Sequence, residues 1–432
     1  LTRTSVRGRK FQVLAQVAGG AFVELAPPPA RTYRGAVRGA PGDNVAASLL
    51  PCGLSACVLS QGGGGWAIRP LRFFDPAGPR ERHIVYALAD VDLPPCGCEH
   101  VDLPSAPPPS QGAAEGRAAK KGGCTLSAAA IAFDSDYEYL ERKCGGDTDL
   151  AVAVIEDGLN IANLIYIRDV RITHPLSAVV LRTDPLADFY AQFPDASDFG
   201  AMLSAFRAEW NANMKHIDRD LAYLVTGKPK PNYGGLAWVK VVCSNYAYGM
   251  GIGGLGYEDI FRHEAGHNWG AGHSCGEERR FIMCGNSIPA FSAHNIRVIR
   301  AFRDTLGCLE ETTYEAAAAP PYVRLDPVVM TQGDGALSVD VLDGDTDINC
   351  DLLTLAAFDA RSARGAHIRV VDTPSPDGRE ALLFSPRADF AGTDWFGYTA
   401  GDGTGFDVEG VCTVKVLSRG LIGYFPFEET AG

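Results

Sequence analysis

The chain has 432 residues, more than one ordinary domain needs, so we expect two or three domains that each bury their own core. Its net charge of −13 and pI near 5.2 argue against nucleic acid or an anionic membrane surface as partners, because binding a polyanion requires a basic face. No uninterrupted apolar stretch of about twenty residues is evident, so the sequence predicts no membrane span.

Residues 1–102 consist of short apolar runs that alternate with Gly and Pro turns, as in "GWAIRPLRFF" and "HIVYALADV", and they predict a β-rich module. Residues 103–123 include "PSAPPPSQGAAEGRAAKKGG", which is too rich in Pro, Gly and Ala to bury a core. We interpret this stretch as a linker, in which Arg117, Lys120 and Lys121 offer an accessible cleavage site for a trypsin-like or furin-like protease.

Residues 124–312 alternate between strand and helix patterns, which predicts an α+β domain. The stretches "TLSAAAIAF", "ITHPLSAVVLRT" and "GGLAWVKVVC" are typical of strands. Apolar residues at helical spacing in "TDLAVAVIEDGLNIANLIYIRDV" and "FGAMLSAFRAEWNANMKH" predict two helices.

Residues 320–418 lose helical periodicity and predict an all-β sandwich, with landmarks such as "DGDTDINCDLL" that resemble cadherin-like modules. Four carboxylates there either bind Ca²⁺ or are solvated turn residues: Asp343, Asp345, Asp347 and Asp351. Residues 419–432 resemble the first strand of a laminin-G-like jelly roll. We expect these C-terminal β modules to bind a matrix or cell-surface ligand.

The cysteines, twelve in number, indicate an oxidising compartment, so we expect a secreted, extracellular protein; buried free thiols are the alternative. The chain begins with Leu1 rather than Met, so we expect any secretion signal to lie outside it. Pairing neighbours along the chain predicts three disulfides: Cys52–Cys57, Cys124–Cys144 and Cys350–Cys412.

The stretch "HEAGHNWGAGH", residues 263–273, predicts a catalytic zinc site. His263 and His267 are four residues apart, so on a helix they point from one face. His273 can join them only if the chain turns, and Gly270 stands where a left-handed residue would end the helix. Glu264 would lie beside the metal without ligating it, as a general base for a water molecule.

This stretch resembles the metzincin signature HExxHxxGxxH, and Met283 in "FIMCG" resembles the Met-turn of those zinc peptidases. The resemblance implies a mixed sheet with an active-site helix, one catalytic Zn²⁺ on the three histidines, and a protein or peptide substrate. An extended substrate would pair with the edge strand "GGLAWVKVV". Residues after Met283, such as Ile288 and Pro289, would line the S1′ pocket of the enzyme.

The cysteines resemble the reprolysin, or adamalysin, branch, which implies the disulfides Cys275–Cys284 and Cys243–Cys308. Ser274 is a departure, because reprolysins commonly have Asp at this position. Residues 1–102 resemble a reprolysin propeptide, in which a Cys-Gly dipeptide places a thiolate on the zinc; Cys96 fits this role, and Cys98 is the alternative. A cut in the linker would then remove the thiolate and open the fourth zinc position to water.

The sequence therefore predicts a latent, secreted zinc endopeptidase with a C-terminal β module. One alternative is an adhesion or matrix protein whose protease-like domain binds without cutting. Another is a zinc hydrolase that acts on a bond other than a peptide bond.

Overall fold

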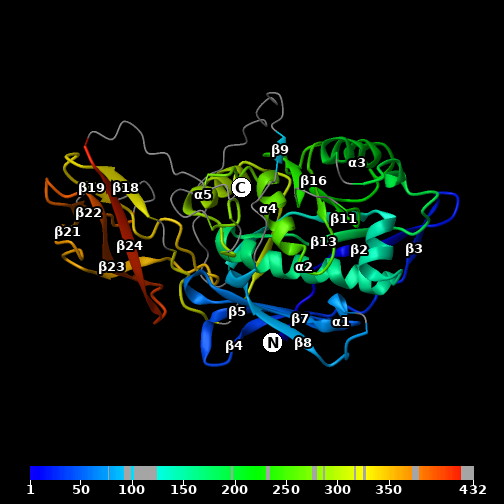
Figure 1. Cartoon of the computed structure of the whole chain (residues 1–432), viewed down its shortest axis with the longest axis horizontal. Helices are drawn as coiled ribbons and strands as arrows, with labels where there is room; N and C mark the ends of the chain where they lie inside the picture. Colours follow the sequence, from blue (N-terminus) through cyan, green and yellow to red (C-terminus); the bar gives the residue numbers. More distant parts are fainter. Residues whose placement is uncertain are drawn as a thin grey trace. The chain divides into compact units, whose positions relative to one another are not determined.

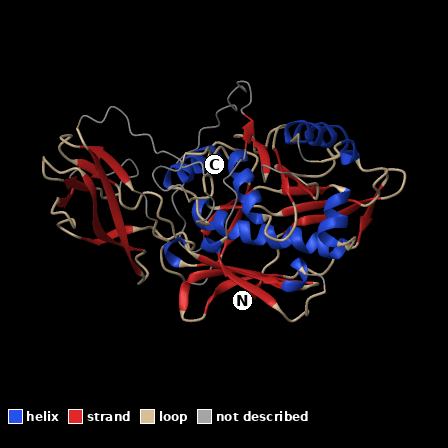
Figure 2. Cartoon of the chain, in the orientation of Figure 1, coloured by secondary structure: helices blue, strands red, loops and turns tan. Residues whose placement is uncertain are grey.

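The computed structural model describes residues 1–75, 77–91, 99–101, 124–195, 198–229, 234–274, 280–285, 288–315, 318–324, 327–371 and 379–419. The chain divides into two compact units, of which the first comprises Leu1–Cys275, Arg279–Ala319 and Ile348–Cys350. The second is built mainly from Pro320–Asp347 and the residues after Cys350. The N-terminal β-rich segment and the predicted α+β domain thus share one unit (Figures 1 and 2).

An antiparallel sheet of six strands forms much of the N-terminal segment. Its strands, in spatial order, are β1 (Thr2–Arg3), β4 (Thr32–Val37), β5 (Ala40–Leu50), β6 (Gly53–Leu59), β7 (Gly65–Pro70) and β8 (His83–Ala87). The short helix α1 (Leu71–Phe74) and two 3₁₀ turns, η1 (Gln61–Gly63) and η2 (Leu88–Asp90), connect or follow these strands. The β-rich prediction for this segment agrees with these elements.

The central sheet has eight strands and draws them from both parts of the unit. In spatial order they are β3 (Phe22–Leu25), β2 (Arg7–Gln16), β13 (Leu176–Arg182), β11 (Ile131–Ser135), β14 (Leu221–Thr226), β16 (Tyr248–Ile252), β15 (Gly235–Trp238) and β9 (Glu99–Val101). Strands β2, β13, β11, β14 and β16 are parallel, and β11 and β14 are buried along their whole length, as expected where helices cover both faces. The N-terminal segment therefore supplies strands at both ends of this sheet.

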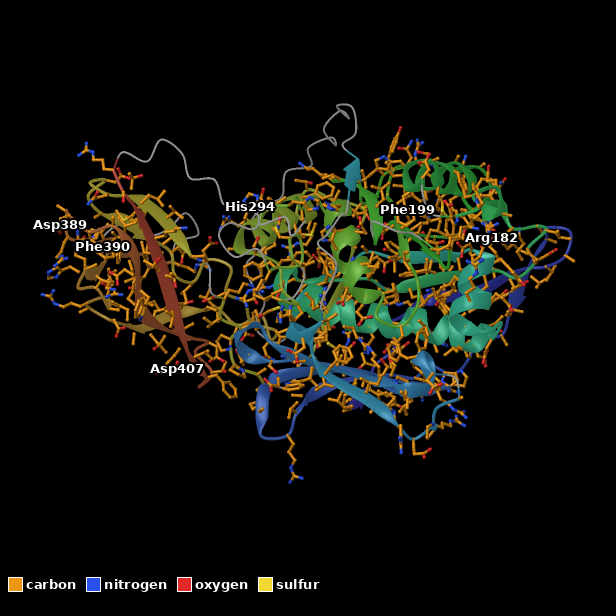
Figure 3. All side chains as sticks on the ribbon, viewed as in Figure 1. Arg182, Phe199, His294, Asp389, Phe390 and Asp407 are labelled. Atoms are coloured by element: carbon orange, nitrogen blue, oxygen red, sulfur yellow. A yellow bond between two sulfur atoms is a disulfide. The ribbon has the colours of Figure 1, made fainter. Side chains whose placement is uncertain are left out.

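Two long helices cover the central sheet. Helix α2 (Thr148–Val170) lies between the central sheet and the N-terminal sheet (Figure 1), and α3 (Phe199–Asn213) packs with Ala178, Val180 and neighbouring strand residues. Each helix begins at an Asp whose carboxylate accepts from a backbone N–H of the first turn, Asp147 from Leu150 and Asp198 from Ala201. Figure 3 marks Phe199 at the start of α3 and Arg182 at the end of β13, both buried.

Helix α2 is long and apolar enough to cross a membrane by composition alone. Its residues 151–170 are all buried within the unit, so it is the core helix of this fold. The remaining helices of the unit are α4 (Glu258–Asn268), α5 (Ala293–Arg303), the π-helical turn η3 (Tyr139–Lys143) and the 3₁₀ turn η4 (Phe189–Gln192). A sheet of three strands completes it: β12 (Ile172–Thr173), β10 (Cys124–Ala128) and β17 (Glu310–Tyr314).

The second unit is a sandwich of two small sheets, as predicted for residues 320–418. One sheet has the order β18 (Val328–Thr331), β24 (Asp407–Leu417), β23 (Gly392–Gly401) and β20 (Thr354–Phe358), and the other has β19 (Leu337–Val339), β22 (Leu382–Ser385) and β21 (His367–Val370). Both sheets contribute to one apolar core, which includes Phe384 and Phe396 with stacked rings. Residues 420–432, with the predicted jelly-roll strand, lie outside the described residues.

The disulfides differ from the predicted set. Cys243–Cys308 is present, but Cys124 pairs with Cys350, so the predicted pairs Cys124–Cys144 and Cys350–Cys412 are wrong. Pairing neighbours in sequence failed here because strand β10 brings Cys124 to a segment 226 residues away, while Cys412 lies in the core of the sandwich.

The predicted Cys52–Cys57 disulfide is also wrong, because both cysteines are free. Strand β6 is extended from Gly53 to Leu59, and about four residues of extended strand separate the two positions by ~13 Å. That span exceeds the Cα separation of about 7 Å that a disulfide can bridge. Cys275 lies outside the described residues, so Cys275–Cys284 stays a prediction, although Cys284 is itself disulfide-bonded.

Candidate active site

Helix α4 carries two of the three predicted zinc ligands. His263 and His267 lie one turn apart on it and are buried. The helix ends at Asn268, and Gly270 takes a φ of 94°, so the left-handed turn predicted at this glycine is present. After the turn the chain folds back, so that the exposed side chain of His273 lies close to those of His263 and His267.

The ring nitrogens of the three histidines form a donor set that fits a metal ion. The Nδ1 atoms of His263 and His267 each lie 2.8 Å from a backbone carbonyl, of Ile282 and Ala271 respectively. A carbonyl can only accept, so both Nδ1 atoms carry the proton and both Nε2 atoms keep a lone pair. The Nε2 of His263 lies 3.1 Å from that of His267 and 3.2 Å from that of His273.

Those separations suit zinc. A tetrahedral ion with Zn–N distances of about 2.0–2.1 Å holds its nitrogens ~3.3 Å apart. Lone pairs that face one another at this distance repel unless a cation lies between them. The carbonyl contacts fix the tautomer and the ring orientation in advance, which is the arrangement expected of ligating histidines.

Met283 packs against helix α4, which carries two of these histidines. Its side chain is fully buried, and a Cβ added to Gly266 on α4 would lie 2.6 Å from its Sδ. The preceding residue, Ile282, supplies the carbonyl that holds His263. The turn therefore packs against the helix between the two helical ligands and orients one of them.

Glu264 is fully buried and lies against strand β15. A Cβ added to Gly235 of that strand would lie 2.6 Å from Glu264 Cγ and 2.7 Å from its Oε1. Only glycine leaves room for the carboxylate at this position. The predicted general base is thus enclosed between its own helix and the predicted substrate strand.

Comparison with protein families identifies two regions of the chain. Residues 152–274 match the family described as metallo-peptidase family M12B reprolysin-like, and residues 318–415 match the bacterial Ig domain. The chain contains a reprolysin-like metallopeptidase domain. That family is zinc-dependent, in agreement with the donor set of the three histidines.

The solved structures described below share little sequence with this chain. A comparison with curated proteins gives no match. A chain from the "structure of a chaperone-substrate complex" is 19% identical with a TM-score of 0.34, over 41% of this chain and 34% of that one. An endo-fucoidan hydrolase of glycoside hydrolase family 107 is 15% identical with a TM-score of 0.18, over 26% of this chain and 17% of that one. This chain spans about a third, or less, of those two structures.

Strand β15 of the reprolysin-like domain is already paired in this structure. It runs antiparallel to β16 on one side and parallel to the backbone of β9 on the other, with Leu236 opposite Glu99 and Trp238 opposite Val101. The edge predicted to bind an extended substrate is therefore covered by the chain's own residues 99–101. Cys96 and Cys98 precede this strand and lie outside the described residues.

The segment after the Met-turn, predicted to line the S1′ pocket, is held by two residues that the sequence analysis missed. Arg168 Nη2 donates to the carbonyl of Pro289 at 2.8 Å, and Asp169 Oδ2 accepts from the N–H of Phe291 at 2.9 Å. Both belong to the last turn of α2 and are buried. Charged residues in the last turn of a core helix were the available signal, because such groups are buried only with partners.

Next to α4, here called the zinc helix because it carries His263 and His267, lies a chain of buried polar side chains that the sequence analysis also missed. Trp269 Nε1 donates to His174 Nε2 at 3.0 Å, and His174 Nδ1 lies 3.0 Å from Asn163 Oδ1. Burial lowers the pKa of His174 to about 3, so this histidine is neutral. Tyr166 Oη donates to the Arg262 carbonyl at 2.8 Å, so α2 supports the zinc helix from this side too.

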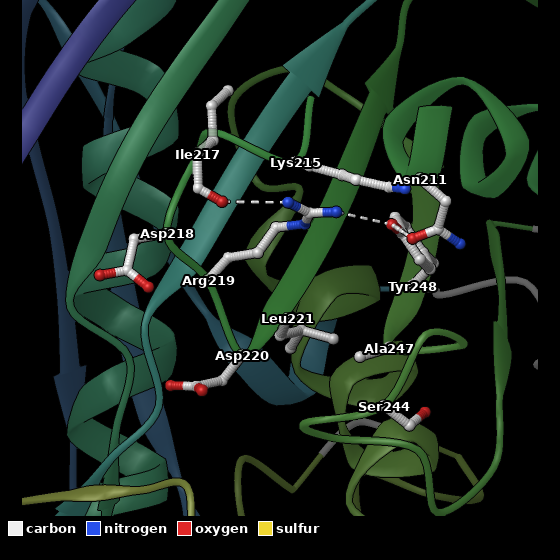
Figure 4. Close-up of a pocket in the computed structure, with 10 residues that line it drawn as sticks. All are labelled: Asn211, Lys215, Ile217, Asp218, Arg219, Asp220, Leu221, Ser244, Ala247 and Tyr248. Carbon is white, nitrogen blue, oxygen red and sulfur yellow. Dashed lines mark hydrogen bonds between the residues drawn. The ribbon is translucent and has the colours of Figure 1, made fainter. Parts of the chain in front are cut away.

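A separate cavity of about 280 Å³ lies elsewhere in the unit and contains none of the zinc ligands (Figure 4). Arg219 crosses it, donating to the carbonyls of Met214 and Ile217 and to Tyr248 Oη. Asp220, at its edge, accepts from the Ala130 N–H. These groups are engaged within the fold, so we assign the cavity no ligand.

The predicted calcium ligands separate in the structure. Asp345 accepts from the Arg324 N–H and from Tyr398 Oη, which gives it a structural role. Asp347 and Asp351 lie together with Asp402, with carboxylate oxygens within 4.8 Å of one another. Asp402 was not predicted, because it comes from a distant turn after β23. Calcium binding at this cluster stays a prediction.

Proposed function

We propose that the chain is the latent form of a secreted zinc endopeptidase that hydrolyses extracellular proteins. The observation that carries this proposal is the convergence of three Nε2 atoms, with Glu264 buried beside them and Gly235 leaving room for its carboxylate against strand β15. An adhesion protein would not need a tautomer-fixed metal cluster with an adjacent carboxylate at a peptide-binding edge.

Each group of residues at the site has its own role in this mechanism. His263, His267 and His273 would hold the ion, which when bound supplies Lewis-acid activation of water and of the scissile carbonyl. Glu264 accepts the proton of the attacking water on a carboxylate oxygen and delivers it to the leaving amine. Strand β15 offers backbone N–H and C=O groups that align an extended peptide, and Gly235 lets that backbone approach Glu264.

Latency in this proposal has two components. Cys96, or alternatively Cys98, would occupy the fourth zinc position as a thiolate, and cleavage between residues 103 and 123 would remove it. The pairing of β9 with β15 supports this, because it covers the substrate edge with a strand that begins immediately after Cys98. A substrate can add to the same edge only after β9 leaves it.

Export is supported by Cys124–Cys350 and Cys243–Cys308, because such bridges persist in oxidising compartments. The Ig-like unit would bind a matrix or cell-surface ligand and so bring the protease to its substrate. This role is proposed from its architecture alone.

The test is Glu264→Ala in protein that has been cut in the linker. The variant should retain one zinc per chain and lose cleavage of an unfolded protein substrate by a factor of 10² or more. Glu24→Ala, a change of the same residue type at an exposed position of β3, is the matched control and should cleave normally. Undiminished cleavage by Glu264→Ala would refute the proposal, and cleavage by neither the wild type nor the control would favour the adhesion alternative.

A further inference from the structure

The N-terminal segment is built into the reprolysin-like domain through its central sheet. Strand β2 pairs with β13 in parallel over Gln12 to Gln16, and the side chains of Val13, Leu14 and Ala15 are buried there. Strand β3 then forms the outer edge. Without β2, the buried strand β13 would become an open edge with unpaired backbone groups.

The same segment covers the polar side chains of the core helix. Glu156, Asp157 and Asn160 of α2 are each at most 3% exposed, although most residues of this helix are apolar. All three meet strands of the N-terminal segment. Arg7 pairs with Glu156, Ser55 Oγ donates to Asp157 Oδ2 at 2.6 Å, and Arg34 Nε donates to Asn160 Oδ1 at 2.9 Å.

Asn160 also donates to two backbone carbonyls of the N-terminal sheet, those of Tyr33 and Ala47, at 3.2 Å each. Its amide is therefore used as both donor and acceptor across this contact. Polar groups matched in this way are typical of a specific, persistent interface, because each mismatch would leave a buried group unsatisfied.

Arg69 extends the contact to the zinc helix itself. It is 1% exposed, pairs with Glu258 at the first residue of α4, and donates to Ser55 Oγ at 2.9 Å. Burial lowers the pKa of Arg69, but Glu258 and Asp157 outweigh burial and hold it above its ordinary value, so the guanidinium is charged. If the N-terminal segment left, these two carboxylates would lose the cation between them at the start of the helix that holds His263 and His267.

Strand β9 makes a far smaller contact with the domain. Its described part is three residues long and pairs by backbone with β15. A cut after it removes the covalent connection to Cys124 without altering β2 or the α2 contacts.

From this contrast we infer that residues 1–91 are a permanent structural part of the protease and remain bound after cleavage between Val101 and Cys124. Activation then consists of β9 leaving the substrate edge while the rest of the segment stays. The mature protein is a complex of two chains, in which the N-terminal chain supports α2 and the zinc helix. This inference concerns association, so it can be tested whether or not the protein cleaves a substrate.

The test uses the full chain with a recognition sequence for a site-specific protease inserted between Val101 and Cys124. After complete cutting, native mass spectrometry and gel filtration at nanomolar concentration should show one species that contains both fragments. Denaturing electrophoresis without reductant should separate them. Fragments that separate under native conditions would overturn the inference, and so would fragments joined by a disulfide, because the contacts would then not be what holds them.

A pair of variants tests whether the buried contacts are responsible. Arg69→Met in the cut protein should raise the dissociation constant of the two fragments at least tenfold, while Arg38→Met, at an exposed turn, should leave it unchanged. If the uncut Arg69→Met chain fails to fold by circular dichroism, Ser55→Ala replaces it, since this change removes only the hydroxyl that donates to Asp157 and accepts from Arg69. Equal dissociation constants for the contact variant and Arg38→Met would overturn the assignment.

Discussion

Acid should lower the stability of the first unit through His174, and the size of the loss follows from the burial of this side chain. The side chain is fully buried, its pKa lies near 3 instead of 6.5, and its neutral form accepts from Trp269 while it contacts Asn163. Between those pKa values the unfolded chain binds more protons than the folded one, so stability falls as pH falls from 6.5 towards 3. At pH 4, which is about 2.5 pH units below 6.5, the free energy of unfolding should therefore be lower by about 3 kcal/mol, at ~1.36 kcal/mol per unit.

The assay compares wild type with His174→Gln, which keeps an oxygen to accept from Trp269 but cannot be protonated. Urea unfolding followed by tryptophan fluorescence is measured at pH 7, 5.5 and 4, in metal-free protein so that loss of zinc does not contribute. Burial raises the pKa of Asp136 to about 7 and of Asp157 to about 6, so these carboxyls act in the opposite direction, but they are present in both proteins. The wild type should lose about 3 kcal/mol more than the variant by pH 4. Parallel curves for the two proteins would refute the reasoning.

Three further changes test other parts of the structure. Gly235→Ala places a Cβ 2.6 Å from Glu264 Cγ, so kcat should fall by ~10² with zinc content unchanged; normal kcat would contradict this role for the glycine. Replacing Cys124 and Cys350 together by Ser opens a bridge across 226 residues, which should cost up to about 5 kcal/mol and lower Tm in calorimetry, whereas an unchanged Tm would show that the bridge is dispensable. Asp169→Ala removes the acceptor that holds the segment after the Met-turn, so kcat/KM should fall about tenfold and selectivity at P1′ should broaden in a peptide panel; an unchanged selectivity profile would oppose this assignment.

Local patterns in the sequence predicted much of the site. The helix over residues 148–170, the placement of His263 and His267 one turn apart on one helix, and the left-handed turn at Gly270 each depend on spacings of a few residues, and the structure has all of them. Such features are fixed by helix geometry and by the conformational freedom of glycine, which act over one or two turns.

Contacts between distant segments were not predictable in the same way. The pairing of β2 with β13 joins residues more than 150 positions apart, and Cys124–Cys350 spans a larger interval, so neither leaves a local pattern. One signal was present in the sequence: Glu156, Asp157 and Asn160 interrupt an apolar helix with polar groups on neighbouring positions. In a helix buried on all sides, such groups require a polar partner, and that partner proved to be the N-terminal segment.

The proposed function requires that this chain cuts peptide bonds by means of a zinc ion on the three histidines. The most direct measurement is mass spectrometry of a peptide mixture after incubation with linker-cut protein in three states: zinc-loaded, stripped with a chelator, and stripped then reloaded with zinc. New peptide termini should appear in the first and third states and none in the second. Termini that appear equally in all three states, or in none although zinc is bound at one ion per chain, would contradict it.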